Sequence, residues 1–155
     1  MVCFNGYTLL FTTNDQTADG HIPKVDLSPC TIIEEIKFLV GMVPVATLPL
    51  RAILEALESV ASRRVGVITL DLDTTDTGDE FGRELLQYFQ RLDFNLHWIA
   101  LARQGGRQTV VKLSANDPFI LGSCLRRFKT HGKLILGTRS GGPSGFLGDV
   151  RWFEE

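Results

Sequence analysis

The sequence predicts a single α/β (α+β) domain in which helices pack on a mostly antiparallel sheet. The chain has 155 residues, of which 44% are hydrophobic, and this is enough for one domain with a core. Residues 65–72 (VGVITLDL) and 94–102 (FNLHWIALA) are rich in strand-forming side chains, which predicts two strands. Between them, apolar residues recur at helical spacing at Phe81, Leu85, Phe89 and Leu92. A helix between two strands predicts a crossover unit that lays the strands side by side.

Four elements are predicted before this unit. Residues 7–13 (YTLLFTT) form a first strand, and residues 14–27, which are rich in turn formers, form an exposed loop. Residues 28–41 form a helix with Ser28 as its N-cap. A second helix begins near Thr47, and its apolar face consists of Leu50, Ile53, Leu54, Leu57 and Val60.

The antiparallel part of the predicted sheet is a hairpin that begins with the second strand of the crossover unit. Thr77 and Glu80 have the spacing of a capping box, which starts the crossover helix near Gly78. After the second strand, Gly105 and Gly106 allow the positive φ of a tight turn. Residues 107–113 (RQTVVKL) are therefore expected to fold back on residues 94–102 as a hairpin.

The last third of the chain is expected to complete the sheet. A helix over residues 116–132 has Pro118 in its first turn, and a strand follows at residues 133–138. Residues 139–148 (RSGGPSGFLG) have the composition of a flexible loop, and residues 149–153 alternate as an edge strand. Together the elements predict a palm or ferredoxin-like arrangement within one domain over residues 1–155.

Composition narrows the function classes. The net charge of -2 and the pI of about 5.9 give no support to nucleic-acid binding. Cys3, Cys30 and Cys124 lack the spacing of a zinc site or a disulfide framework, so we expect reduced thiols. No apolar run approaches the roughly 18 residues that span a bilayer, and the sequence shows no leader pattern. We therefore expect a cytoplasmic protein without membrane insertion.

Three acidic residues follow one another closely at the end of the first central strand. Asp71, Asp73 and Asp76 are placed where a magnesium ion is often held beside a phosphate. The ordinary interpretation is a solvated loop with an Asx turn, because strand-to-helix loops collect aspartates. Isolated histidines and the absence of a nucleophile motif in the sequence leave covalent hydrolase chemistry without support.

A second candidate is the glycine pair with its neighbouring arginines. Gly105 and Gly106 could admit a phosphate to bare backbone amides, and Arg103 and Arg107 would add guanidinium contacts. A plain glycine hairpin is the commoner cause of such a pair. The sequence thus predicts an anion site at the turn and leaves the structural alternative open.

The central stretch resembles a degenerate form of the GGDEF domain of bacterial diguanylate cyclases. Within roughly residues 47–113 it reads LPLRAILEALES, VITLDLD, GDEFGRELL and ARQGGRQTVVKL in the family's order. The GDEF string at residues 78–81 opens the crossover helix and is not the counterpart of the family motif. The C-terminal run from GGRQTVVKL to VRWFEE is also similar to the degenerate GGDEF domain of the cyclic-di-GMP-responsive accessory protein of bacterial cellulose secretion.

The resemblance implies roles for single residues. Asp71 would occupy the family's metal-ligand position, Asp79 would read a guanine edge, and the glycine pair would lie against nucleotide phosphates. The family has two acidic residues after the glycines, whereas this chain has Arg107 and Gln108. Since two-metal phosphoryl transfer needs those carboxylates, the resemblance implies a catalytically silent domain. The family's RxxD inhibitory site is absent too, because residues 97–100 read HWIA.

The leading hypothesis is therefore a catalytically inactive GGDEF-like regulatory domain that needs no cofactor. It would act through protein partners, with a nucleotide or cyclic dinucleotide as candidate ligand, in bacterial signalling or exopolysaccharide secretion. One alternative is a magnesium-dependent phosphoryl-transfer enzyme that uses the three aspartates. Another is a ligand-free interaction module, for which exposed aromatics would be the contacts, although burial in the core is their ordinary fate: Trp98, Trp152 and Phe153.

Overall fold

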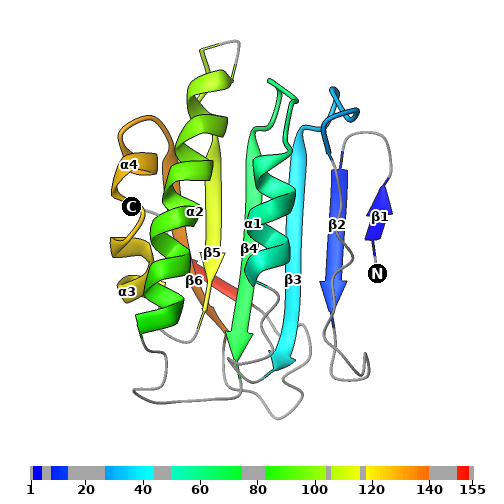
Figure 1. Cartoon of the computed structure of the whole chain (residues 1–155). Helices are drawn as coiled ribbons and strands as arrows, with labels where there is room; N and C mark the ends of the chain where they lie inside the picture. The colour runs from blue at the N-terminus through cyan, green and yellow to red at the C-terminus, as the bar shows by residue number, and fades with distance from the viewer. Residues whose placement is uncertain are drawn as a thin grey trace.

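The computed structural model describes residues 2–4, 8–13, 27–43, 50–74, 83–103, 106–115, 118–139 and 150–153. Its strands are β1 (Val2–Phe4), β2 (Thr8–Thr13), β3 (Glu35–Val43), β4 (Val67–Thr74), β5 (Val110–Ser114), β6 (Lys133–Arg139) and β7 (Val150–Phe153). Its helices are α1 (Leu50–Glu58), α2 (Arg83–Ala102), α3 (Pro118–Ser123) and α4 (Arg126–Lys129). The seven strands form one sheet in which the spatial order follows the order along the chain (Figure 1).

The α/β class is confirmed, but the sheet is mostly parallel. Strands β2 to β6 pair parallel with one another, and only the edge pairs β1–β2 and β6–β7 are antiparallel. The expected mostly antiparallel sheet, and with it the palm or ferredoxin-like arrangement, is wrong. Parallel neighbours need a crossover connection, and α1, α2 and the α3–α4 pair supply those between β3 and β6.

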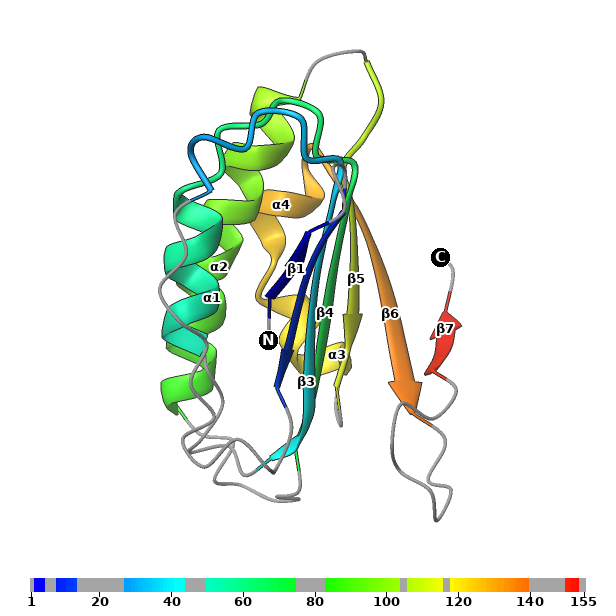
Figure 2. The same cartoon turned by 90° about the vertical axis from the view of Figure 1, so that its right-hand side faces the viewer.

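All four helices lie on one face of the sheet (Figure 2). Each crossover moves one strand further in the same direction, and right-handed connections then place every helix on the same side. The core fills the space between this face and the helices. Its largest fully buried side chains include Ile36, Phe38, Ile53, Leu57, Ile68, Leu70, Phe89 and Phe128.

The strand predicted at residues 94–102 is the largest error. These residues continue α2, which runs unbroken from Arg83 to Ala102. A short apolar run cannot be assigned to a strand or a helix by periodicity alone, and this run has apolar residues both on its buried face, with Leu96 and Ile99, and on its exposed face, with Trp98. The predicted hairpin is wrong for the same reason, because β5 has no antiparallel partner there and pairs parallel with β4.

A second helix prediction is also wrong. Residues 28–41 were expected to be helical, whereas Glu35–Val43 form the strand β3. Ile36 and Phe38 are fully buried and Lys37 between them is half-buried, which is the alternation of a strand. In the predicted loop over residues 14–27, Leu27 is buried in the core, and the rest of that loop lies outside the described residues.

The remaining elements agree with the sequence analysis within a few residues. Strands β2, β4, β6 and β7 and helix α1 are confirmed, and β1 was missed. The helix expected over residues 116–132 is divided into α3 and α4, with Leu125 at the N-cap of the second. The capping box at Thr77 and Glu80 lies outside the described residues, as do residues 140–148 of the expected loop. In the described part of the chain, no helix is long and apolar enough to cross a membrane.

Candidate functional site

The candidate residues from the sequence fall at two opposite ends of the sheet. Asp71 lies near the carboxyl end of β4, in register with Ser114 on β5. Gly106 lies in the segment that enters β5, whose first residue Val110 pairs with Val67 at the amino end of β4. The crossover unit predicted from the sequence would lay the strand that carries Asp71 beside a strand that ends near the glycine turn. Because residues 94–102 are helical, this proximity is wrong. Gly105, Asp76 and Asp79 lie outside the described residues.

The carboxyl end of the sheet carries polar residues on the face that the helices leave open. Leu70 and Leu72 face the helices, so Asp71 between them points to the opposite face, where it is only 4% exposed. Ser114 is also buried, and its Oγ has no hydrogen-bond partner among the described residues. The described residues contain no group of three side chains suited to hold a metal ion.

Topology makes this end an unusual place for a ligand. In open α/β sheets, ligands bind beyond the carboxyl ends of the strands where the winding reverses and two helices diverge to opposite faces. In this sheet the described strands follow one another in a single direction, and their helices share one face. No crevice of that kind is formed by the described elements.

The amino end of the sheet contains a hollow of about 470 Å³. Its lining residues come from β2, β3 and β4, from the residues just before β3 and β4, and from the segment between α2 and β5: Thr8, Glu34, Glu35, Arg64, Gly66, Val67, Arg103 and Arg107. Thr8, Glu35 and Val67 are register partners on β2, β3 and β4, and they share the sheet face opposite the helices. We call this feature the arginine hollow, because Arg64, Arg103 and Arg107 are its cationic residues.

Arg64 is placed by a buried serine. The Ser62 hydroxyl donates a hydrogen bond of 2.7 Å to the Ile33 carbonyl oxygen and accepts one of 3.2 Å from the Arg64 backbone N–H. The bond to Ile33 is buried and therefore shielded from water, and the bond from Arg64 is partly buried. They fix the segment before β4 against the segment before β3 and hold Arg64 at the rim of the hollow.

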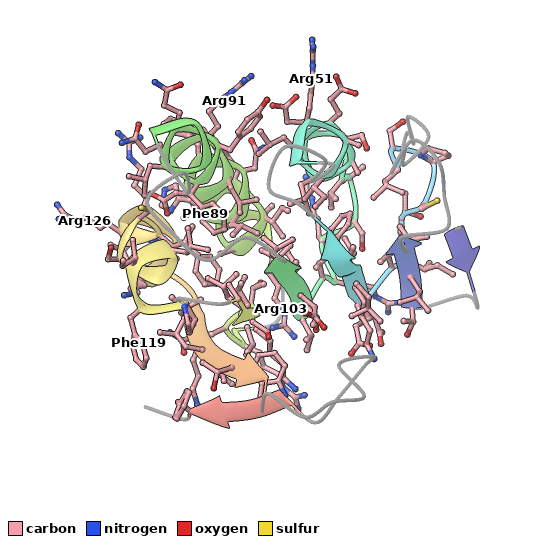
Figure 3. All side chains as sticks on the ribbon, turned by 90° about the horizontal axis from the view of Figure 1, so that it is seen from below. Arg51, Phe89, Arg91, Arg103, Phe119 and Arg126 are labelled. Carbon is pink, nitrogen blue, oxygen red and sulfur yellow. The ribbon has the colours of Figure 1, made fainter. Side chains whose placement is uncertain are left out.

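Arg103 reaches the hollow from the end of α2. Its guanidinium donates a hydrogen bond to the Gln108 carbonyl oxygen. It also lies against Gly66, where an added Cβ would come within 2.8 Å of the Arg103 Nη2. Figure 3 shows the Arg103 side chain on the side of β4 and β5 away from α1 and α2. A glycine at position 66 is thus what lets this guanidinium lie flat on the backbone.

The entry into β5 brings the third arginine. Gly106 has a φ of 74°, a left-handed conformation that glycine adopts without strain, and the exposed Arg107 follows it. The buried Thr109 hydroxyl then donates a 3.0 Å hydrogen bond to the Val65 carbonyl oxygen. This bond fixes the turn against the start of β4, which keeps Arg107 beside Arg103.

Cations exceed anions in this hollow. Three arginines face two glutamates, Glu34 and Glu35, which leaves a formal charge of +1. Glu35 already pairs with Lys37 at 3.2 Å, and in the described part of the chain no carboxylate forms an ion pair with any of the three arginines. Guanidinium groups present forked N–H donors that match the oxygens of a phosphate, so the arrangement is suited to bind an anion.

No protein-family model, curated protein or solved structure matches the chain. The resemblance to the GGDEF family therefore stays a hypothesis. The candidate site rests on the geometry of the arginine hollow.

Sequence reasoning found two of the three arginines and missed the rest of the lining. Arg103 and Arg107 were identified because they flank a glycine pair in sequence. Arg64, Gly66 and the two glutamates come from segments that only the parallel strand order brings to the same edge. The run SRRVG directly before a strand was a usable signal, since arginines before parallel strands collect at one edge of the sheet.

Proposed function

We propose that this chain is a catalytically inactive regulatory domain that binds a phosphate-bearing ligand in the arginine hollow and acts through a protein partner. One observation carries the proposal: three arginines, one from the segment before β4 and two from the segment between α2 and β5, line one hollow, and none is ion-paired in the described part of the chain. A nucleotide or a cyclic dinucleotide is the candidate ligand, and bacterial signalling or exopolysaccharide secretion is the setting that the GGDEF resemblance suggests.

Electrostatics supports an anionic ligand of small size. Converging guanidinium groups repel one another, and an anion between them offsets this repulsion. The whole molecule has a net charge of -2, so it does not attract anions at long range. Affinity must then arise from contacts inside the hollow, whose volume of about 470 Å³ falls in the range of small-molecule sites.

The distribution of carboxylates supports a binding role without catalysis. Phosphoryl transfer needs carboxylates that hold metal ions against the reacting phosphate. Asp71 and Asp73 lie towards the carboxyl end of β4, whereas the hollow lies at its amino end beside Val67. No observation on the described residues favours the phosphoryl-transfer alternative. We therefore assign Asp71 and Asp73 no part in ligand binding at the hollow.

Calorimetric titration with pyrophosphate, GTP and cyclic-di-GMP tests the proposal. We expect at least one of these ligands to bind, and Arg64→Gln to weaken it about tenfold, since a hydrogen bond to a charged group contributes about 1.5–3 kcal/mol and exposure at Arg64 favours the lower end. Arg63→Gln is the matched control, because Arg63 is an exposed neighbour outside the lining and its loss should leave binding unchanged.

A second variant tests the geometry without removing a charge. Gly66→Ala should displace the flexible Arg103 guanidinium, and binding should weaken although all three arginines remain. Equal losses in Arg63→Gln and Arg64→Gln would show non-specific attraction and contradict the site. If none of the three ligands binds, the ligand half of the proposal is wrong and the chain reduces to an interaction module.

A further inference from the structure

The outer surface of α2 carries a continuous apolar stripe. Phe94 and Leu101 are each 44% exposed and Trp98 is 60% exposed. Their spacing of four and three residues places them one above another on the helix surface. We call these three residues the α2 stripe. The burial expected for Trp98 is thus wrong.

The stripe is not explained by the packing of α2 on the sheet. Phe89, Leu92, Leu96 and Ile99 already form the buried face of the same helix. A surface helix needs one apolar face, whereas a helix that is apolar on both sides is normally covered on both. Within the described part of the chain, no element covers the outer side of Phe94, Trp98 and Leu101, each of which remains substantially exposed.

A short basic helix contacts the stripe through one of its arginines. The Arg127 guanidinium lies 4.5 Å from the centroid of the Phe94 ring, and Arg126 and Lys129 come from the same short helix α4. All three side chains are exposed, and Figure 3 shows Arg126 projecting outward from the molecule. We call these residues the basic rim. Every charged residue of α4 is basic, and residues 94–102 contain no acidic residue.

The stripe and the rim are held in fixed relation. Asp93 on α2 is 6% exposed, and its carboxylate oxygens accept hydrogen bonds from the backbone N–H groups of Phe128 at 2.8 Å and Arg127 at 3.1 Å. His97 Nδ1 lies 3.0 Å from the Arg127 carbonyl oxygen, which can only accept. The surface therefore exists before a partner arrives, which lowers the ordering cost of binding.

We propose that the α2 stripe and the basic rim bind an amphipathic helix of a partner protein, with apolar residues on one face and acidic residues along one flank. An apolar stripe fits the helix-in-groove mode of recognition, and the rim supplies charge complementarity for the acidic flank. This inference deepens the protein-partner half of the proposed function, and it does not depend on a ligand in the arginine hollow.

Charge favours this occupant over two others. A second copy of the chain that docked through the same surface would bring another basic rim and, from residues 94–102 and α4, no acidic residue, so it offers no charge complementarity. An anionic bilayer interacts with the whole molecule, whose net charge of -2 opposes approach. A short acidic helix senses mainly charges within a Debye length of about 8 Å, and there the basic rim dominates.

Fluorescence anisotropy with two labelled synthetic peptides tests the proposal. Both are amphipathic helices of about 18 residues with leucines at helical spacing, and they carry either glutamates or lysines along one flank. The acidic peptide should bind the wild-type protein and the basic peptide should not. Trp98→Gln should weaken binding about tenfold or more, whereas Ile32→Gln, at an exposed apolar residue outside the stripe, should leave it unchanged.

A charge exchange makes the test specific. The double variant Arg126→Glu/Arg127→Glu should lose the acidic peptide and gain the basic one. Arg64→Gln should bind the acidic peptide as the wild type does, so a failure of the ligand proposal is distinguishable from a failure here. Equal binding of both peptides, or of neither, overturns the inference. Trp98-dependent dimers in sedimentation, or Trp98-dependent binding to phosphatidylserine vesicles, would instead assign the stripe to a second copy or a membrane.

Discussion

Asp93 shows how one buried side chain can position a separate element. Helix α4 has Leu125 at its N-cap, which provides no side-chain hydrogen bond to the free amides of the first turn. The Asp93 carboxylate, delivered from α2, accepts from two of those amides instead. A negative charge at a helix N-terminus is favourable, so the contact stabilises α4 and the basic rim together.

Substitution of Asp93 should therefore destabilise the fold. We expect Asp93→Ala to lower the free energy of unfolding by about 1–3 kcal/mol, because it leaves the Arg127 and Phe128 amides without acceptors. Asp93→Asn should cost less, because its amide oxygen can still accept one of the two bonds. Urea unfolding measures both, with the exposed Gln90→Ala on the same helix as control. A loss in Asp93→Ala no larger than the loss in the control would disprove this capping role.

At the scale of elements, the two wrong assignments have a common physical origin. Residues 94–102 belong to a helix with apolar residues on both its buried and its exposed face, and β3 is a strand whose preceding residues carry Ser28 and Pro29, typical of a helix start. A local sequence pattern shows which side chains are apolar, but it does not show which other elements of the fold bury them. The amphipathic helix α1 was predicted correctly, and on its wet face the exposed Arg51 pairs with Glu55 at 3.5 Å.

A pair of substitutions distinguishes a helix from a strand over residues 94–102. Leu96 and Trp98 would share a face in a strand, whereas in α2 Leu96 is fully buried and Trp98 is exposed. Leu96→Ala should therefore lower the free energy of unfolding by about 2–5 kcal/mol, because it leaves a cavity in the core. Trp98→Ala should change it by no more than about 0.5 kcal/mol. Chemical denaturation of both variants gives the comparison, and similar costs would contradict the helix.

The whole molecule is governed by the winding of its sheet. Because β2 to β6 are parallel neighbours, their amino ends lie at one edge of the sheet and their carboxyl ends lie at the other. This separates the arginine hollow from Asp71, whereas the predicted crossover unit would have placed Asp71 near the glycine turn. Arg103 and Arg107 could be identified as site residues because they flank a glycine pair in the sequence. Arg64 reaches the same hollow only because of the order of the strands in the sheet, and a local sequence pattern does not reveal that order.

The most direct test of the account locates the ligand on the sheet. The amide nitrogen–proton NMR spectrum is recorded during titration with whichever of pyrophosphate, GTP or cyclic-di-GMP binds in calorimetry. We predict shifts at the amino end of the sheet, at the amides of Gly66, Val67 and Gly106, with those of Leu72 and Ser114 unchanged. Shifts confined to Leu72, Ser114 and their neighbours would place the ligand at the carboxyl end and contradict the account.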